Sequence, residues 1–250
     1  MRKNTAKAKL AAGQIVTALS GADTADWIDR LGPLGIDAIW LEGEHGPVDF
    51  GPLGDLTRAC DLWAMTSIVR VGQIEANTIY RVLDRGAQGI AVPHVNTADE
   101  ARQVVDAAKF APIGHRGMFV SRQGYGVSDY FHQANDQTMV VVLIEDVAAL
   151  ENLEKILEVD HIDVFHVAHH DLAQSMGYIG RADHPDVQRA VDQTITRIVA
   201  AGRTCGTSTD ATTVGRFATA GVRFFYTHIQ DWIRTGFSQY QSAATTGAAR

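Results

Sequence analysis

Eight short apolar segments recur along the chain, and each precedes a segment whose apolar residues are spaced as on one face of a helix. Short apolar runs of this kind are typical of strands buried on both faces, as in parallel sheets covered by helices. We predict strands at residues 14–19, 36–41, 67–71, 89–95, 139–144, 162–168, 204–208 and 222–227. The repetition predicts a (β/α)8 barrel, with an open doubly wound sheet as the alternative.

Length and motifs favour the barrel. The 250 residues match the usual size of this fold. The sequence contains neither a Gly-x-Gly-x-x-Gly turn after a strand nor a Gly-Lys-Ser/Thr phosphate loop, which nucleotide-binding open sheets use. We therefore predict a single barrel domain over residues 1–250, with an amino-terminal helical extension at 1–12 and a disordered tail at 243–250.

Charge and cysteine content argue against several classes of partner. A formal net charge of −7 disfavours nucleic acid and anionic membranes, which bind basic surfaces. No run of eighteen apolar residues is present, so we expect no membrane span. Cys60 and Cys205 lack the paired spacing of a metal site, which suits a reducing cytoplasm.

One segment interrupts the alternation of strands and helices. Residues 111–137 are rich in Gly, Tyr, Ser and Asp and are much longer than an ordinary connection. Long loops of this kind form lids or subunit contacts, and the alternative is a disordered excursion. We predict that Arg116, Arg122 or Tyr125 contacts another subunit.

Polar side chains lie at or just after the carboxyl ends of five of the predicted strands. In barrels of this class, ligands bind at the carboxyl ends of the strands, so these residues should converge on one mouth. They are Glu42, Glu44 and His45 after the second strand, Arg70 near the end of the third, His94 near the end of the fourth, Glu145 and Asp146 after the fifth, and His169, His170 and Asp171 after the sixth.

A metal site is the first chemistry that these residues suggest. Glu145 follows six apolar residues, where a lone charge needs a partner, and Asp171 follows the adjacent strand. Two hard oxygen ligands, with waters and substrate completing the shell, are typical of Mg²⁺ or Mn²⁺, whereas histidines nearby would admit Co²⁺ or Zn²⁺. The alternatives are a helix-capping role for Glu145 and solvent-facing histidines at 169 and 170.

His45 and Arg70 suit acid–base and electrostatic roles. His45, with Glu42 or Glu44 nearby, is a candidate general acid or base, and Arg70 offers a permanent positive charge to a carboxylate or oxyanion. The alternatives are a loop histidine for His45 and a simple ion pair with Glu42 or Glu44 for Arg70.

Two covalent mechanisms find little support. Beyond the first nine residues the only lysines are Lys109 and Lys155, both in predicted helices, so no strand-end lysine is available for a Schiff base. Neither cysteine has an evident base, and no Gly-x-Ser-x-Gly elbow is present.

Beyond these patterns, the sequence resembles the HpcH/HpaI aldolases, the metal-dependent (class II) pyruvate aldolases, over nearly its whole length. The segments that carry the resemblance are Trp40–His45, Val69-Arg70, Val92–Thr97 with Glu100–Arg102, Gly114–Gly117, Leu143–Glu145, Asp171-Leu172 with Gly177-Tyr178, and His184–Val187.

The resemblance implies a barrel whose divalent cation, Mg²⁺, Mn²⁺ or Co²⁺, is held at Glu145 and Asp171. A 2-oxo acid such as pyruvate chelates that ion, and its enolate adds to an aldehyde or is released by the reverse cleavage. Arg70 polarises the keto oxygen, and His45, with Glu42, manages protons. The resemblance also implies a hexamer, a trimer of dimers, that exchanges a carboxyl-terminal helix at residues 230–240.

The chain departs from the family pattern around the expected substrate. Ala168, His169 and His170 stand where Gly-Pro-Ala is usual, Leu143 where glutamine is usual, and His228 in the last strand's terminal motif. We therefore assign these five residues to substrate binding. The leading hypothesis is an aldolase. The alternatives are a metal-dependent decarboxylase or an unusual condensing enzyme for an oxaloacetate-like acid, and a non-enzymatic metabolite-binding subunit.

Overall fold

A computed structural model describes residues 1–248, and residues 249 and 250 lie outside the described part. Within residues 1–248, eight parallel strands pair in sequence order and close into a barrel, with the last strand beside the first. The strands are β1 Val16–Ser20, β2 Ala38–Glu42, β3 Thr66–Arg70, β4 Gly89–Val92, β5 Met139–Ile144, β6 Val164–Val167, β7 Cys205–Ser208 and β8 Phe224–His228. All eight predicted strands are confirmed, with ends that shift by up to three residues, and the open sheet is excluded.

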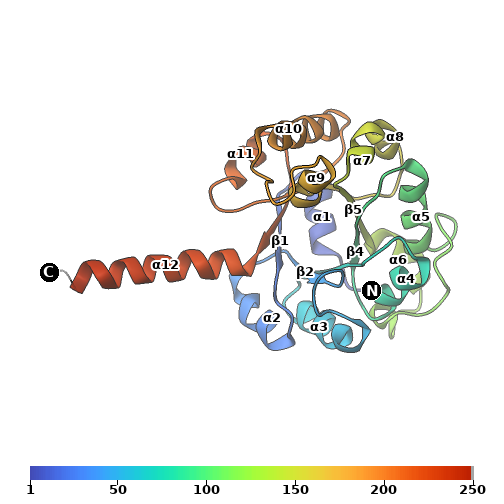
Figure 1. The fold of residues 1–250 in the computed structure, drawn as a ribbon. Coiled ribbons are helices and arrows are strands. Elements are labelled where there is room, and N and C mark those ends of the chain that lie inside the picture. Colours follow the sequence, from blue (N-terminus) through green and yellow to red (C-terminus); the bar gives the residue numbers. More distant parts are fainter. Residues whose placement is uncertain (249–250) are drawn as a thin grey trace.

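Twelve α-helices occur within residues 1–248, and most of them surround the barrel in a ring (Figure 1). They are α1 Thr5–Ala11, α2 Ala25–Leu31, α3 Phe50–Leu62, α4 Ala76–Asp84, α5 Ala98–Ala108, α6 Tyr130–Gln137, α7 Val147–Glu151, α8 Leu153–Leu157, α9 His169–Ser175, α10 Pro185–Ala200, α11 Val214–Thr219 and α12 Ile229–Ala248, with short 3-10 helices η1 Gly32–Leu34 and η2 Arg122–Gly124. Helix α5 begins with the capping box expected from its sequence, because the Thr97 hydroxyl accepts from Glu100 N while the Glu100 carboxylate accepts from Thr97 N. Within residues 1–248, no helix is both long and apolar enough to cross a membrane.

Strand β5 shows why the apolar runs form a barrel. All six of its residues are buried. Alternate side chains face opposite sides of the strand, and both sides are covered. Val141 and Leu143 pack inside the barrel with Trp40 and Phe224, whereas residues 140, 142 and 144 pack outward against the helices. Burial on both faces explains the continuous apolar run.

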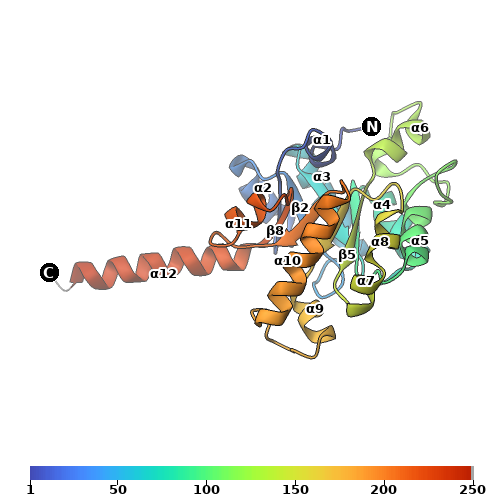
Figure 2. The same ribbon diagram turned by 90° about the horizontal axis from the view of Figure 1, so that it is seen from above.

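The two ends of the barrel differ. Helix α1 closes the amino-terminal end, opposite the end where α9 lies (Figure 2). Asn4 caps α1 through Lys7 N and also donates to the carbonyl oxygens of Gln88 and Gln137. These hydrogen bonds hold the amino-terminal extension against the amino-terminal end of the barrel. The extension therefore does not cover the carboxyl ends of the strands, where a ligand can bind.

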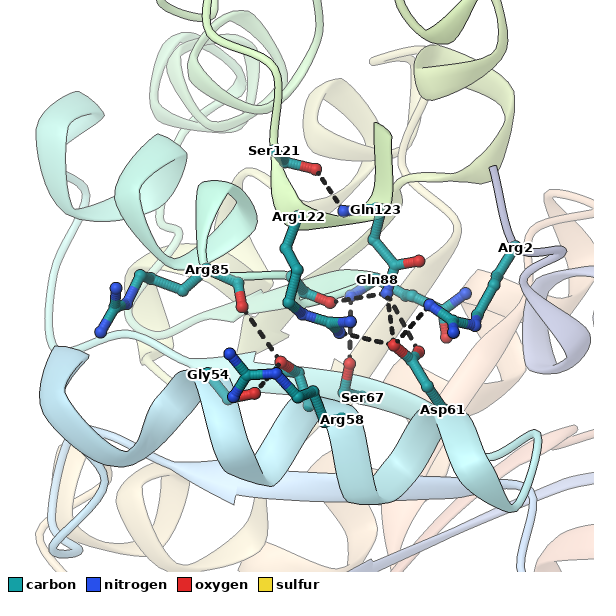
Figure 3. Close-up of polar contacts among 12 residues, drawn as sticks. Arg2, Gly54, Arg58, Asp61, Ser67, Arg85, Gln88, Ser121, Arg122 and Gln123 are labelled. Atoms are coloured by element: carbon teal, nitrogen blue, oxygen red, sulfur yellow. Dashed lines mark hydrogen bonds and ion pairs between the residues drawn. The ribbon is translucent and has the colours of Figure 1, made fainter. Parts of the chain in front are cut away.

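The long segment 111–137 folds back onto the barrel's own helices. Arg122 and Gln123 both bond the carboxylate of Asp61, which is almost fully buried near the end of α3 and is also bonded by Arg2 (Figure 3). Arg116 is buried and pairs with Asp84 at 2.8 Å. Arg116 and Arg122 thus have partners within the chain, while Tyr125 is exposed; the predicted subunit contact stays a prediction.

Helix α12 leaves the barrel and projects away from it (Figure 1). The structure continues this helix through Ala248, so residues 243–248 of the expected disordered tail are helical, and residues 249 and 250 lie outside the described part. Along α12 the side chains of Trp232, Ile233, Phe237 and Tyr240 are exposed. Exchange of this helix between subunits remains a prediction.

Candidate active site at the carboxyl ends of the strands

A cavity of about 220 Å³ opens at the carboxyl ends of the strands. Larger hollows lie on the outer flank, one of about 760 Å³ beside α5. We place the site at the mouth, because charged side chains from β2, β3 and the β5 and β6 ends converge there. The mouth cavity is lined by Trp40, His45, Arg70, Leu143, His166, Ala168, His169, His170, Asp171, Ser208 and Tyr226.

Arg70 is held by two carboxylates from the end of β2. Glu42 pairs with Arg70 directly across the β2–β3 register, and Arg70 Nε donates to Glu42 Oε1 at 3.0 Å and to Oε2 at 2.8 Å. Glu44 Oε2 lies 2.9 Å from Arg70 Nη1, as an ion pair whose geometry falls short of a hydrogen bond. The ion pair considered as an alternative for Arg70 is therefore present, and the guanidinium still lines the cavity.

The three charges shift one another's pKa values. Burial opposes ionisation of Glu42, but the charge and hydrogen bonds of Arg70 outweigh it and lower the Glu42 pKa. Burial prevails at Glu44 and raises its pKa against the pull of Arg70. Burial also disfavours the charged Arg70, yet Glu42 and Glu44 raise its pKa. Arg70 is thus a fixed positive charge at the mouth.

Glu145 follows β5 and is deeply buried, with 1% of its surface exposed, and within the described chain it is not among the residues that line the mouth cavity. Its Oε1 accepts from His94 N at 2.8 Å, and His94 Nδ1 lies 2.9 Å from Asp146 Oδ2. His94 adopts a left-handed backbone conformation, with φ of 52°, which a non-glycine residue seldom adopts. Glu145 makes no capping hydrogen bond to α7, so the alternative role as a helix cap is not realised.

The second oxygen of Glu145 is unusual. Among residues 1–248, Oε2 is buried and has no hydrogen-bond partner. Burial, together with the negative charges of Asp171 and Glu44, raises the Glu145 pKa to about 7 against the opposing effect of His94. A buried carboxylate oxygen without a partner is costly, and a cation beside it would remove that cost.

The donor set fits a hard divalent cation that binds few protein ligands. Asp171 lies in the first turn of α9, lines the cavity and is close enough to affect Glu145 electrostatically. No cluster of three or more His, Cys, Asp or Glu side chains suited to a metal occurs in the described part of the chain. Two carboxylates with the remaining positions open match Mg²⁺-type binding, which keeps several waters, better than a closed zinc site.

The two histidines before Asp171 lie in different environments. His169 Nε2 lies 2.8 Å from Thr207 Oγ1, and its ring packs against Phe217. Burial lowers the His169 pKa to about 4, so this imidazole is neutral and fixed against β7. His170 is exposed at the rim of the cavity, as the solvent-facing alternative proposed. Ala168 and Leu143 line the same cavity.

Two predicted residues lie farther from the centre. His45 lines the cavity, but 69% of its side chain is exposed and its Nε2 lies 3.9 Å from Glu44 Oε2. His228 is not among the residues that line this cavity within the described chain. It ends β8, where its Nδ1 accepts from Gln230 N at 3.1 Å beside Gly21.

Four lining residues escaped the sequence reasoning: Trp40, His166, Ser208 and Tyr226. Trp40, His166 and Tyr226 lie within β2, β6 and β8, in largely apolar runs that are typical of a core, whereas Ser208 is the last residue of β7. One signal could have revealed them: a residue with polar atoms near a strand end, at a position that faces the barrel interior. His166 is an example, because it lies two residues before Ala168 and side chains two apart on a strand point to the same face.

A closed parallel barrel with Asp171, Arg70 and histidines lining a cavity at its carboxyl-terminal mouth is typical of a barrel enzyme that acts on a small molecule. The chain belongs to the HpcH/HpaI aldolase/citrate lyase family, whose model matches residues 17–234.

Named relatives agree with this assignment. A 2-keto-3-deoxy-L-rhamnonate aldolase of Klebsiella pneumoniae is 40% identical over 177 residues, which span 69% of this chain and 66% of that protein. A protein of the same name from Escherichia coli is 35% identical over 209 residues, spanning 81% of this chain and 78% of that protein. Among solved structures, an HpcH/HpaI aldolase/citrate lyase family protein from Burkholderia cenocepacia superposes with a TM-score of 0.90 at 26% identity, covering 97% of this chain and 100% of that chain.

Proposed function

We propose that this protein is a class II aldolase, a lyase that cleaves or forms a carbon–carbon bond next to a 2-oxo acid such as pyruvate, with an aldehyde as partner. The names of its relatives support a sugar-acid substrate of the 2-keto-3-deoxy type. The absence of a strand-end lysine agrees with a mechanism that forms no Schiff base. We also propose a cytoplasmic location, supported by the free thiols of Cys60 and Cys205.

One observation carries the proposal: the buried, unpartnered Oε2 of Glu145 near Asp171. We assign these two carboxylates to a divalent cation, Mg²⁺, Mn²⁺ or Co²⁺. When bound, such a cation supplies positive charge that stabilises negative charge developing on the keto oxygen of the 2-oxo acid. His94 holds Glu145 for this task through its backbone N–H.

Arg70 provides the second positive charge at the site. Its Nε is occupied by Glu42 and its Nη1 lies 2.9 Å from Glu44 Oε2, which fixes the plane of the guanidinium, and we assign Nη2 to the substrate. Glu42 is thus a positioning residue for Arg70. A preorganised donor of this kind stabilises an oxyanion without reorganising in the reaction.

His45 suits proton exchange with solvent. It lines the cavity yet is mostly exposed, and the backbone N–H groups of His45 and Glu44 are both held by Glu42 Oε1, at 3.0 and 2.9 Å. We assign His45 as the acid–base group, and Ala168, His169, His170 and Leu143, which line the cavity, as the residues that shape substrate binding. His228 lies outside that lining, so we assign it an indirect part in substrate binding.

We further propose that the chain assembles as a hexamer, a trimer of dimers, by exchange of α12. An apolar cavity of about 370 Å³ lies outside β1 and β8, lined in part by Leu34, Phe225 and Trp232. Trp232 belongs to α12, so the start of this helix borders the cavity, while the rest of α12 projects away from the barrel. The exposed apolar residues of α12 match what a partner subunit would cover.

An assay of retro-aldol cleavage tests the proposed function. The chelated protein should be inactive on 2-keto-3-deoxy sugar acids and should release pyruvate when Mg²⁺, Mn²⁺ or Co²⁺ is restored. Oxaloacetate, assayed in parallel, separates the aldolase from the decarboxylase alternative. Full activity after exhaustive chelation, or activity on oxaloacetate alone, would contradict the proposal.

A further inference from the structure

His166 lies inside the barrel at the floor of the mouth cavity. It is 2% exposed, and its ring packs against Trp40, Phe224 and Tyr226 with centroid separations of 5.7, 6.1 and 6.0 Å. A phenylalanine would fill this aromatic surrounding without bringing polar atoms into it. Packing alone therefore does not explain why a histidine occupies this position.

The two ring nitrogens face β7. A Cβ built at Gly206 would lie 2.9 Å from Nδ1, and Nε2 lies 3.4 Å from Ser208 Oγ, nearer the mouth. Nδ1 is buried and has no hydrogen-bond partner within residues 1–248. Both His166 and Ser208 line the cavity that also contains Arg70 and Asp171.

The proton of His166 can be assigned from these contacts. Burial, aided by His169 and Arg70, lowers the pKa of His166 to about 3, so the ring is neutral and carries one proton. A proton on Nδ1 would be a buried donor without an acceptor, which is rarer in proteins than an unpaired acceptor. We therefore place it on Nε2, directed toward Ser208.

We propose that His166 Nε2 and Ser208 Oγ form a specificity site that binds a hydroxyl oxygen of the substrate. The inference rests on the proposed aldolase function and deepens it, because it selects hydroxylated substrates over their deoxy analogues. The 3.4 Å separation of the two atoms is a weak contact, so both remain able to bond a ligand oxygen. Because both groups are neutral, they suit a hydroxyl better than a second carboxylate.

The hydroxyl can belong to the aldehyde or to C3 of the 2-oxo acid, and paired substrates distinguish these sources. With pyruvate as donor, glycolaldehyde is compared with acetaldehyde. With acetaldehyde as acceptor, hydroxypyruvate is compared with pyruvate. The wild-type protein, reloaded with Mn²⁺, should prefer the hydroxylated member of at least one pair in kcat/KM.

Variants at position 166 then test the assignment. His166→Phe should lower that preference about tenfold, the value of one hydrogen bond, measured as the ratio of kcat/KM for the hydroxylated and deoxy substrates. His166→Gln, which retains a neutral donor, should keep most of the preference, and Ser208→Ala should lose part of it. His132→Phe, a change on exposed α6 at the other end of the barrel, is the control and should leave both ratios unchanged.

Unchanged ratios in both pairs for His166→Phe would overturn the proposal, as would equal losses on hydroxylated and deoxy substrates in a protein that melts like the wild type. If His166→Phe does not fold, the Gln and Ala variants decide by the same ratios. Calorimetric Kd values for hydroxypyruvate and pyruvate, measured without aldehyde, give a readout independent of turnover. If the wild type turns over none of the substrate pairs, the aldolase function is refuted. If the wild type is active but His166→Phe leaves the ratios unaltered, only the specificity site is refuted.

Discussion

Replacing Glu145 with glutamine should stabilise the metal-free protein at alkaline pH while abolishing metal binding. Glutamine keeps the oxygen that accepts from His94 N, at 2.8 Å in the native protein, but carries no charge. Burial raises the Glu145 pKa from its ordinary 4.5 to about 7, so forming the buried carboxylate costs about 3 kcal/mol.

The pH dependence has a definite sign. Between pH 4.5 and about 7 the folded state holds a proton on Glu145 that the unfolded chain has released, so the stability of the wild type falls as pH rises through this window. The Glu145→Gln variant lacks this loss. At pH 8 its free energy of unfolding should exceed that of the wild type by up to about 3 kcal/mol, and near pH 4.5 the two should agree.

Urea denaturation in EDTA at pH 5 and pH 8 measures the difference, with Glu158→Gln, an exposed glutamate, as the matched control. Addition of Mn²⁺ at pH 8 should then stabilise the wild type and the control but not Glu145→Gln, because only a folded state that binds the ion gains stability. A variant less stable than the wild type at pH 8 in EDTA, or a gap that does not change with pH, would refute the reasoning.

Three further changes test other parts of the site and fold. Arg70→Lys should lower kcat/KM about 100-fold with little change in metal affinity by calorimetry, because a lysine cannot keep both the Glu42 pairing and an aligned donor; a collapse of metal binding would show that Arg70 is structural. Asp61→Asn should cost about 3 kcal/mol by urea denaturation and speed hydrogen exchange in residues 111–137, because it leaves buried charge unpaired; unchanged exchange would contradict this. The double variant Trp232→Ala and Phe237→Ala should reduce the oligomer seen by light scattering, and an unchanged mass would count against helix exchange.

The barrel could be predicted from the sequence because a strand buried on both faces leaves a continuous apolar run. The run from Met139 to Ile144 marks β5, and the first charge after it, Glu145, lies at the mouth. Arg70, the last residue of β3, and Asp171, which follows β6, are placed at the mouth by the same argument. In a closed parallel barrel the carboxyl ends of all strands lie at the same mouth, so a residue that ends an apolar run can be placed there from the sequence.

Side-chain direction at the strand ends was harder to predict. His169 begins α9 and bonds Thr207 on the next strand, a contact that depends on how β6 and β7 pair. His166 reads as one polar residue in a core strand until closure of the barrel brings it beside Gly206 and Ser208. Arg122 donates to Asp61, which lies 61 residues earlier in the sequence, and no local sequence pattern predicts that contact.

The central claim is that Glu145 and Asp171 hold a divalent cation to which a 2-oxo acid binds beside Arg70. A crystal structure of the protein with Mn²⁺ and pyruvate, with the ion located by its anomalous scattering, tests it most directly. The account predicts Mn²⁺ on the carboxylate oxygens of both residues, including Oε2 of Glu145, with pyruvate in the mouth cavity near Arg70. An ion bound by His169 or His170, or pyruvate outside that cavity, would contradict it.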